Sequence, residues 1–329
     1  MRLLKIVPDN TNIGFVALRR WAFGLTLFLS IGAVVLVGVR GLNFGVDFVG
    51  GLMIEAKFDH QAPLDAVRSK IDSLNVGEAQ LQQFGDAQTV SIRLPLPAST
   101  DEGANNALVN KVEGALKAQY PTVVFNQVQA VGGKVSNELI RNGALAVFLA
   151  IFGIALFGIF RFEWQFGVAT FVSILHDVLM TFGFFALFRS YLEFDLNIVA
   201  AVLTIIGYSI NDKIVIDDRI RENLRKYRQM PIGELIDLSV NETLPRTVMT
   251  SLTIILALAS LLLFGGHVLR GFTAAMILGV VVGTYSSIYV SSSLLITLGI
   301  DKSRFKQMNQ AVDKKKAARE RAERIAPKP

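Results

Sequence analysis

Long apolar stretches, separated by short polar connections, dominate the pattern of the chain. Six of them run over roughly Trp21–Val39, Ala144–Phe160, Phe166–Phe188, Leu196–Ile216, Val248–Phe264 and Phe272–Ile300. A helix needs about 20 apolar residues to cross a bilayer. The pattern therefore predicts a polytopic α-helical membrane protein with six transmembrane helices, the first at 21–39 and five more within 142–300.

The segment 40–141, between the first two spans, has the pattern of a soluble domain. It contains runs with strand periodicity and runs with helix periodicity. We expect strands over Leu52–Phe58, Glu78–Phe84, Thr89–Leu94 and Thr122–Val131, and helices over Pro63–Leu74 and Asp101–Gln119. This β-α-β-β-α-β order predicts a ferredoxin-like α+β domain.

Lysine and arginine gather on one side of the predicted topology. They concentrate in 1–20, at Arg161, in the connection 217–245 and in the tail 301–329. The positive-inside rule places these segments in the cytoplasm and the ferredoxin-like domain in the periplasm. We therefore expect an inner-membrane protein with both termini cytoplasmic, and an amphipathic helix at Pro231–Val240 along the membrane surface.

The amino-acid composition excludes several classes of function. Only 18% of residues are charged, against about 25% in soluble domains. The chain has no cysteine, which excludes thiol chemistry, and its three widely spaced histidines argue against a multi-histidine metal site. No nucleotide-binding loop or catalytic triad appears, so we expect neither an enzyme nor a cofactor. Topology accounts for the net charge of +6, so no nucleic-acid partner is expected either.

Ionisable residues within the apolar stretches are candidate functional sites, because each is costly in a bilayer. Asp212 lies in the fourth span, and Tyr208 and Ser209 share its helix face. Arg246 opens the fifth span at the same end. The spacing allows an ion pair between Asp212 and Arg246, and equally an arginine that extends to the lipid headgroups.

Two further features lie in the third and sixth spans. His176 and Asp177 stand in the middle of the third, either as a buried pair that fixes helix packing or as a proton relay, since imidazole changes charge near neutral pH. Gly279 and Gly283 have the spacing that lets helices pack closely. A polar path lined by the serines that follow is the alternative.

Several long strings resemble one family. They are FGVDFVGG at 44–51, LNIVAAVLTIIGYSIND at 196–212, DRIREN at 218–223, LPRTVMTSLT at 244–253 and GTYSSIYVSS at 283–292. In this order and on these spans they resemble the SecD/SecF protein-export membrane proteins, of the resistance-nodulation-division superfamily, over nearly the whole chain except the tail.

The resemblance implies a subunit that works with SecD beside the SecYEG channel, with YajC as a further partner, and uses the proton motive force to move unfolded preproteins across the bilayer. It implies that Asp212 and Arg246 carry proton coupling together with His176 and Asp177. Tyr208, Ser209 and Asn211 would support them, and Asp47, Gly50 and Gly51 would transmit motion to the outer domain. Protons would be the coupling ion, although Na⁺ stays open.

The chain departs from the family pattern after the Asn-Asp pair. Lys213 stands where we expect a hydroxyl residue, and Asp217 where an aromatic or apolar residue is usual. We expect the Lys213 side chain to extend toward the cytoplasm. Two other functions remain open: half of a small-molecule or lipid exporter of the same superfamily, and a structural scaffold of the translocon.

Overall fold

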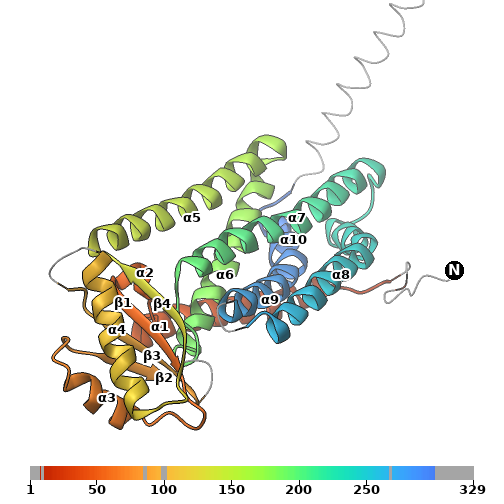
Figure 1. Cartoon of the computed structure of the whole chain (residues 1–329). Coiled ribbons are helices and arrows are strands. Elements are labelled where there is room, and N and C mark those ends of the chain that lie inside the picture. The colour runs from red at the N-terminus through yellow and green to blue at the C-terminus, as the bar shows by residue number, and fades with distance from the viewer. Residues whose placement is uncertain (1–7, 9–10, 84–86, 98–101, 267–268, 301–329) are drawn as a thin grey trace, which may run out of the picture.

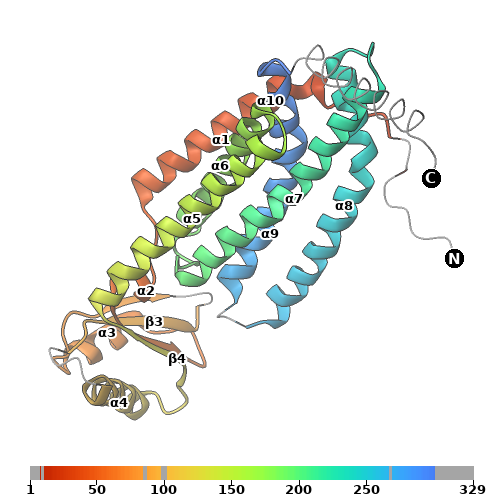
Figure 2. The same cartoon turned by 90° about the horizontal axis from the view of Figure 1, so that it is seen from above.

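The protein is an elongated bundle of long helices with a small α+β domain at one end (Figure 1, Figure 2). It is seen in a computed structural model that describes residues 8, 11–83, 87–97, 102–266 and 269–300. The predicted basic tail 301–329 and most of the N-terminal segment lie outside the described residues. We call the end of the bundle next to the domain the domain end, and the opposite one the far end.

Within the described residues, six helical spans are long and apolar enough to cross a membrane, which confirms the predicted fold class. Five of them are or contain α1 (Arg19–Arg40), α5 (Gly133–Arg161), α6 (Trp164–Leu187), α7 (Leu196–Lys226) and α8 (Ile232–Phe264), and the sixth span, Arg270–Thr297, begins with α9 (Arg270–Tyr285). A single turn, η1 (Val16–Leu18), precedes α1, and a π-helical segment, η2 (Ser286–Ser291), followed by α10 (Ser292–Thr297), continues α9. About half of the residues in the apolar stretches of α6, α7 and the span that begins with α9 are buried, whereas few are buried in those of α1, α5 and α8.

The predicted loop at 217–245 is mostly helical. The α7 helix continues to Lys226, and α8 begins at Ile232 and contains the amphipathic segment predicted at 231–240. Apolar side chains from both extensions share one buried cluster that includes Ile220, Leu224, Leu235 and Ile236. Because this packing stabilises both helices beyond their apolar stretches, only a short connection remains between them.

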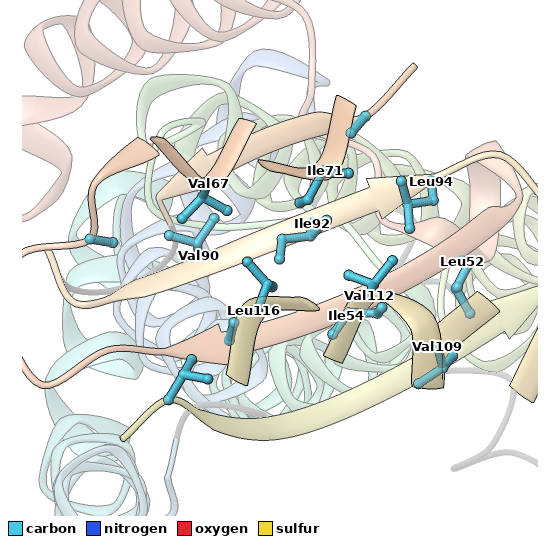
Figure 3. Close-up of a cluster of buried hydrophobic side chains, with 14 of the residues drawn as sticks. Leu52, Ile54, Val67, Ile71, Val90, Ile92, Leu94, Val109, Val112 and Leu116 are labelled. Atoms are coloured by element: carbon cyan, nitrogen blue, oxygen red, sulfur yellow. The ribbon is translucent and has the colours of Figure 1, made fainter. Parts of the chain in front are cut away.

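The domain has the predicted ferredoxin-like topology. Its elements are β1 (Gly51–Lys57), α3 (Leu64–Asp72), β2 (Gln80–Gln83), β3 (Thr89–Leu94), α4 (Glu102–Gln119) and β4 (Val124–Val131). The strands pair antiparallel in the order β2-β3-β1-β4. Alternate side chains of the central strands, among them Ile54 and Ile92, pack against Val67 and Ile71 of α3 and Val112 of α4 (Figure 3).

The other face of the sheet is polar and turns toward the bundle. Glu55, Ser91 and Gln127 line a cavity of about 50 Å³ together with Glu193 and Asp195 from the connection between α6 and α7. The domain therefore rests on the domain end of the bundle through a polar interface rather than through its apolar core.

Candidate functional site

A buried ion pair joins α6 to α7 in the middle of the bundle. The Nζ of Lys213 lies 3.0 Å from Oδ2 of Asp177, and neither side chain has exposed surface. The same Nζ donates to Ser209 Oγ, and to Ser286 Oγ of η2 at 3.3 Å. Ser209 Oγ donates in turn to Asp177 Oδ2, at 2.5 Å. We call Asp177, Ser209, Lys213 and Ser286 the ion-pair cluster.

The expectation that Lys213 extends toward the cytoplasm is wrong. Its side chain points into the bundle, because a carboxylate and two hydroxyl oxygens lie within reach there. The ion pair of Asp177 with Lys213 holds α6 to α7, and a role of Asp177 in proton relay stays a prediction.

Glycines on α9 make room for the cluster. A Cβ at Gly283 would stand 3.1 Å from Ser209 Oγ, and a Cβ at Gly279 would collide with the side chain of Ile205. The absence of side chains at these positions lets α9 approach α7 closely enough for Ser286 to reach Lys213. The packing predicted from the glycine spacing is confirmed.

Asp212 is buried but lies outside this cluster. Its side chain makes no hydrogen bond among the described residues, and its Oδ2 is shielded from solvent without a partner. No ion pair joins it to Arg246 in the part of the chain that the structure describes. Arg246 is exposed on α8, and the charges of Lys213 and Arg246 attract the Asp212 carboxylate without a hydrogen bond or ion-pair contact among the described residues. The arrangement leaves Asp212 as a buried carboxyl group with no neutralising contact.

A chain of hydroxyl groups links α7, α8 and α9 beside Asp212. Tyr208 Oη lies 2.8 Å from Ser251 Oγ, which lies 2.8 Å from Thr284 Oγ1. Asn211 is exposed on the outside of α7. Of the three predicted supporting residues, Ser209 therefore belongs to the ion-pair cluster, Tyr208 to the hydroxyl chain, and Asn211 to neither.

His176 is separated from its neighbour Asp177. Its Nδ1 lies 2.9 Å from Ser30 Oγ of α1, and its ring lies 6.4 Å from that of Tyr285. Consecutive residues point to different sides of a helix. The two residues therefore tie α6 to two neighbours, α1 through His176 and α7 through Asp177, and their role in proton coupling stays a prediction.

The linker between α1 and the domain is fastened to the start of α7. Asp47, on the short helix α2 (Val46–Val49), accepts a hydrogen bond from the backbone N–H of Leu196 at 3.0 Å. Asp195 caps the N-terminus of α7, where its side chain accepts a hydrogen bond from the backbone N–H of Ile198 at 3.1 Å. Both carboxylates stand at the positive end of the α7 dipole. The helix that carries Asp212 and Lys213 is thus attached at its other end to the linker of the domain.

Backbone hydrogen bonds and an ion pair also attach the linker and the domain to the α6–α7 connection. Gly45 N–H donates to Phe194 O at 3.0 Å, and Phe194 N–H donates to Asn43 O at 2.7 Å. Arg93 of β3 pairs with Glu193, with Nη2 and Oε1 2.6 Å apart. The domain is therefore held to the α6–α7 connection both through its linker and through its sheet.

Gly50 and Gly51 form the turn that enters β1. Their φ angles are 75° and 120°, which side-chain-bearing residues rarely adopt. A Cβ on Gly51 would stand 2.9 Å from Leu94 O. These glycines are required by the backbone path between the linker and the sheet.

The burial of Glu193 predicts a pH-dependent stability. Burial raises the pKa of Glu193, and the nearby Arg93 guanidinium opposes only part of this effect. The folded protein then binds the proton more tightly than the unfolded chain. This group therefore stabilises the fold below about pH 4.5, and the contribution is lost as the pH rises through the folded pKa.

We expect the melting temperature of the wild type, relative to that of a Glu193→Gln variant, to fall as the pH rises from about 4 to 7. Thermal unfolding in detergent measures it. The control is Glu138→Gln, which alters an exposed side chain. The difference in melting temperature between this variant and the wild type should not change with pH. A pH-independent difference between wild type and Glu193→Gln would contradict the assignment.

Sequence reasoning missed two of these contacts. The pairing of Lys213 with Asp177 had one local signal, the placement of Ser209 one turn before Lys213 on the same face. The Arg93–Glu193 pair had none, because the domain and the α6–α7 connection are far apart in the sequence and meet only in the folded chain.

Comparison with known proteins accounts for this architecture. Residues 111–301 match the family "Protein export membrane protein SecD/SecF, C-terminal", and residues 35–62 match the "SecD/SecF GG Motif". The chain belongs to the SecD/SecF family. Family membership and the six apolar helices make it a multi-pass inner-membrane protein.

Relatives in the SecD/SecF family include Protein translocase subunit SecF of Cereibacter sphaeroides, 42% identical over 94% of this chain and 96% of the relative. The SecF of Rickettsia rickettsii is 39% identical, over 89% and 94% of the two chains. These relatives are named as translocase subunits, which agrees with a role in transport rather than catalysis.

Two solved structures of SecDF resemble the fold. The crystal structure from Thermus thermophilus matches with a TM-score of 0.80 and 36% identity, over 89% of this chain and 39% of that one. The Super-membrane-facing form matches with a TM-score of 0.63 and 35% identity, over 92% and 40%. The chain thus spans about two fifths of the solved SecDF proteins.

Proposed function

We propose that this Sec translocase subunit couples proton movement across the inner membrane to preprotein translocation, together with SecD and beside the SecYEG channel. YajC is a further proposed partner. The chain matches somewhat under half of the solved SecDF chains, which supports a partner half supplied by SecD. The distribution of basic residues supports cytoplasmic termini and a periplasmic domain.

The observation that carries the proposal is the state of Asp212. Its carboxyl group is buried within a membrane-spanning helix and has no hydrogen-bond partner among the described residues. A buried carboxylate without a partner is strongly disfavoured, so the group must take up a proton or gain a cation. Arg246, exposed on the adjacent helix, is the cation that could approach it when the helices shift.

The attachment of α7 supplies a route from proton to movement. Asp212 lies on α7, and Asp47 of the domain linker accepts a hydrogen bond from the first residue of that helix. A displacement of α7 that follows protonation therefore acts directly on the linker. Such a displacement would move the periplasmic domain against an emerging preprotein.

The membrane potential is large enough to bias this movement. One charge that crosses 100 mV gains about 2.3 kcal/mol, which shifts a two-state equilibrium roughly fiftyfold. This gain does not account for transport of a whole preprotein. We therefore expect the chain to assist a motor at the channel.

The test is translocation of a preprotein into vesicles that contain this chain, SecD and SecYEG. We expect Asp212→Asn to abolish the part of translocation that depends on the membrane potential, since the amide cannot exchange a proton. Complex assembly should be unchanged. Asp218→Asn, which alters an exposed carboxylate on the same helix, should keep that part.

The alternatives give different outcomes. Normal, uncoupler-sensitive translocation by Asp212→Asn would place proton coupling elsewhere and favour a structural scaffold. Potential-driven efflux of a small apolar compound from the same vesicles would favour the exporter alternative.

A further inference from the structure

The ammonium group of Lys213 occupies a complete binding site. Its three hydrogens face three acceptors, Asp177 Oδ2, Ser209 Oγ and Ser286 Oγ, which come from α6, α7 and η2. All four side chains are fully buried or nearly so. The positive charge is thus enclosed by oxygen atoms in the way that a bound cation would be.

Two more oxygens next to this site have no partner. Asp177 Oδ1 and Ser173 Oγ are shielded from solvent and make no hydrogen bond among the described residues. Ser173 lies one turn before Asp177, on the same face of α6. Native proteins rarely leave buried oxygens unsatisfied, so these two oxygens are additional potential ligands beside the three that the ammonium uses.

The chemistry of this oxygen set suits a small hard cation. Carboxylate and hydroxyl oxygens are the ligands that such ions prefer, and one carboxylate matches a single positive charge. The ammonium of a lysine carries the same charge, but it is covalently held and cannot be exchanged with either side of the membrane.

We propose that Lys213 is a tethered cation that permanently fills a monovalent-cation site made of Asp177, Ser209 and Ser286. The site would accept Na⁺ if the lysine side chain were removed. Resting on the proposed function, this inference adds that Na⁺ does not act at Asp177 in this chain, because the Lys213 ammonium already occupies that oxygen site.

The test measures thermal unfolding of the full chain in detergent, with NaCl compared with choline chloride at equal ionic strength. For Lys213→Ser we expect the melting temperature to rise by a few degrees as Na⁺ replaces choline, and to saturate with Na⁺ concentration. Lys213→Met fills the space without a charge, and the double variant Asp177→Asn/Lys213→Ser lacks the carboxylate. Neither should respond to Na⁺, and the wild type should not respond either.

Two results would overturn the proposal. One is a melting temperature of Lys213→Ser that responds to Na⁺ no more than that of Lys213→Met. The other is a Na⁺-specific rise in the melting temperature of the wild type that the substitution Asp177→Asn removes. If Lys213→Ser does not fold, Lys213→Ala is prepared with ethylammonium chloride, which replaces the severed end of the side chain. Recovery of folded protein, relative to tetramethylammonium chloride, is expected, and its absence contradicts the site. These measurements read stability rather than translocation, so their failure is distinct from failure of the proposed function.

Discussion

Replacement of Lys213 by methionine is expected to lower the free energy of unfolding by about 3–5 kcal/mol, because it leaves a buried charge without its partner. Asp177→Asn should cost a similar amount, since the Lys213 ammonium then loses the carboxylate with which it forms its ion pair. The double variant Lys213→Met/Asp177→Asn should recover most of the loss. Two neutral side chains of similar size need no charge compensation in the bundle interior.

Unfolding of the four proteins in a mixed-detergent titration gives this double-mutant cycle. The coupling energy between the two sites should be strongly favourable, because the residues touch. Asp218→Asn combined with Lys213→Met provides the matched control, as Asp218 is exposed on the same helix and should add no coupling. Additive losses for Lys213 and Asp177 would mean that the pair contributes little to the fold.

Gly51→Ala is expected to destabilise the domain by at least about 2 kcal/mol, from a strained backbone and an overpacked contact together. The φ angle of 120° at this position disfavours any side chain, and the new Cβ would stand 2.9 Å from Leu94 O. A backbone oxygen in a paired strand cannot move aside without disturbing the pairing of β1 with β3.

Gly133→Ala is the control for this prediction. Gly133 lies at the start of α5, close to Gly50, yet a Cβ there meets nothing within 4 Å. Alanine should therefore be tolerated or slightly stabilising in that helix. The melting temperature of each variant and proteolysis of the domain provide the measurement. Equal effects of the two substitutions would show that the turn at Gly51 does not constrain the domain.

The sequence determined the fold class of this protein. Apolar stretches long enough to cross a bilayer predict six spans without tertiary information, since every backbone polar group in lipid must be satisfied within its own helix. The alternating patterns of the segment 40–141 likewise predict the ferredoxin-like topology, because strand and helix periods differ. Asp177 and Asp212 stood out for the same reason: charges in a membrane are costly.

The tertiary structure decided which charges meet. Lys213 and Asp212 are consecutive, yet Lys213 faces Asp177 in the interior and Asp212 has no hydrogen-bond partner among the described residues, because neighbouring positions on a helix point in different directions. The acceptors of the Lys213 ammonium come from helices far apart in the sequence, and Gly279 and Gly283 set how closely those helices approach. Helix spacing and rotation arise from packing between segments, so no local pattern in the chain could specify the ion-pair cluster.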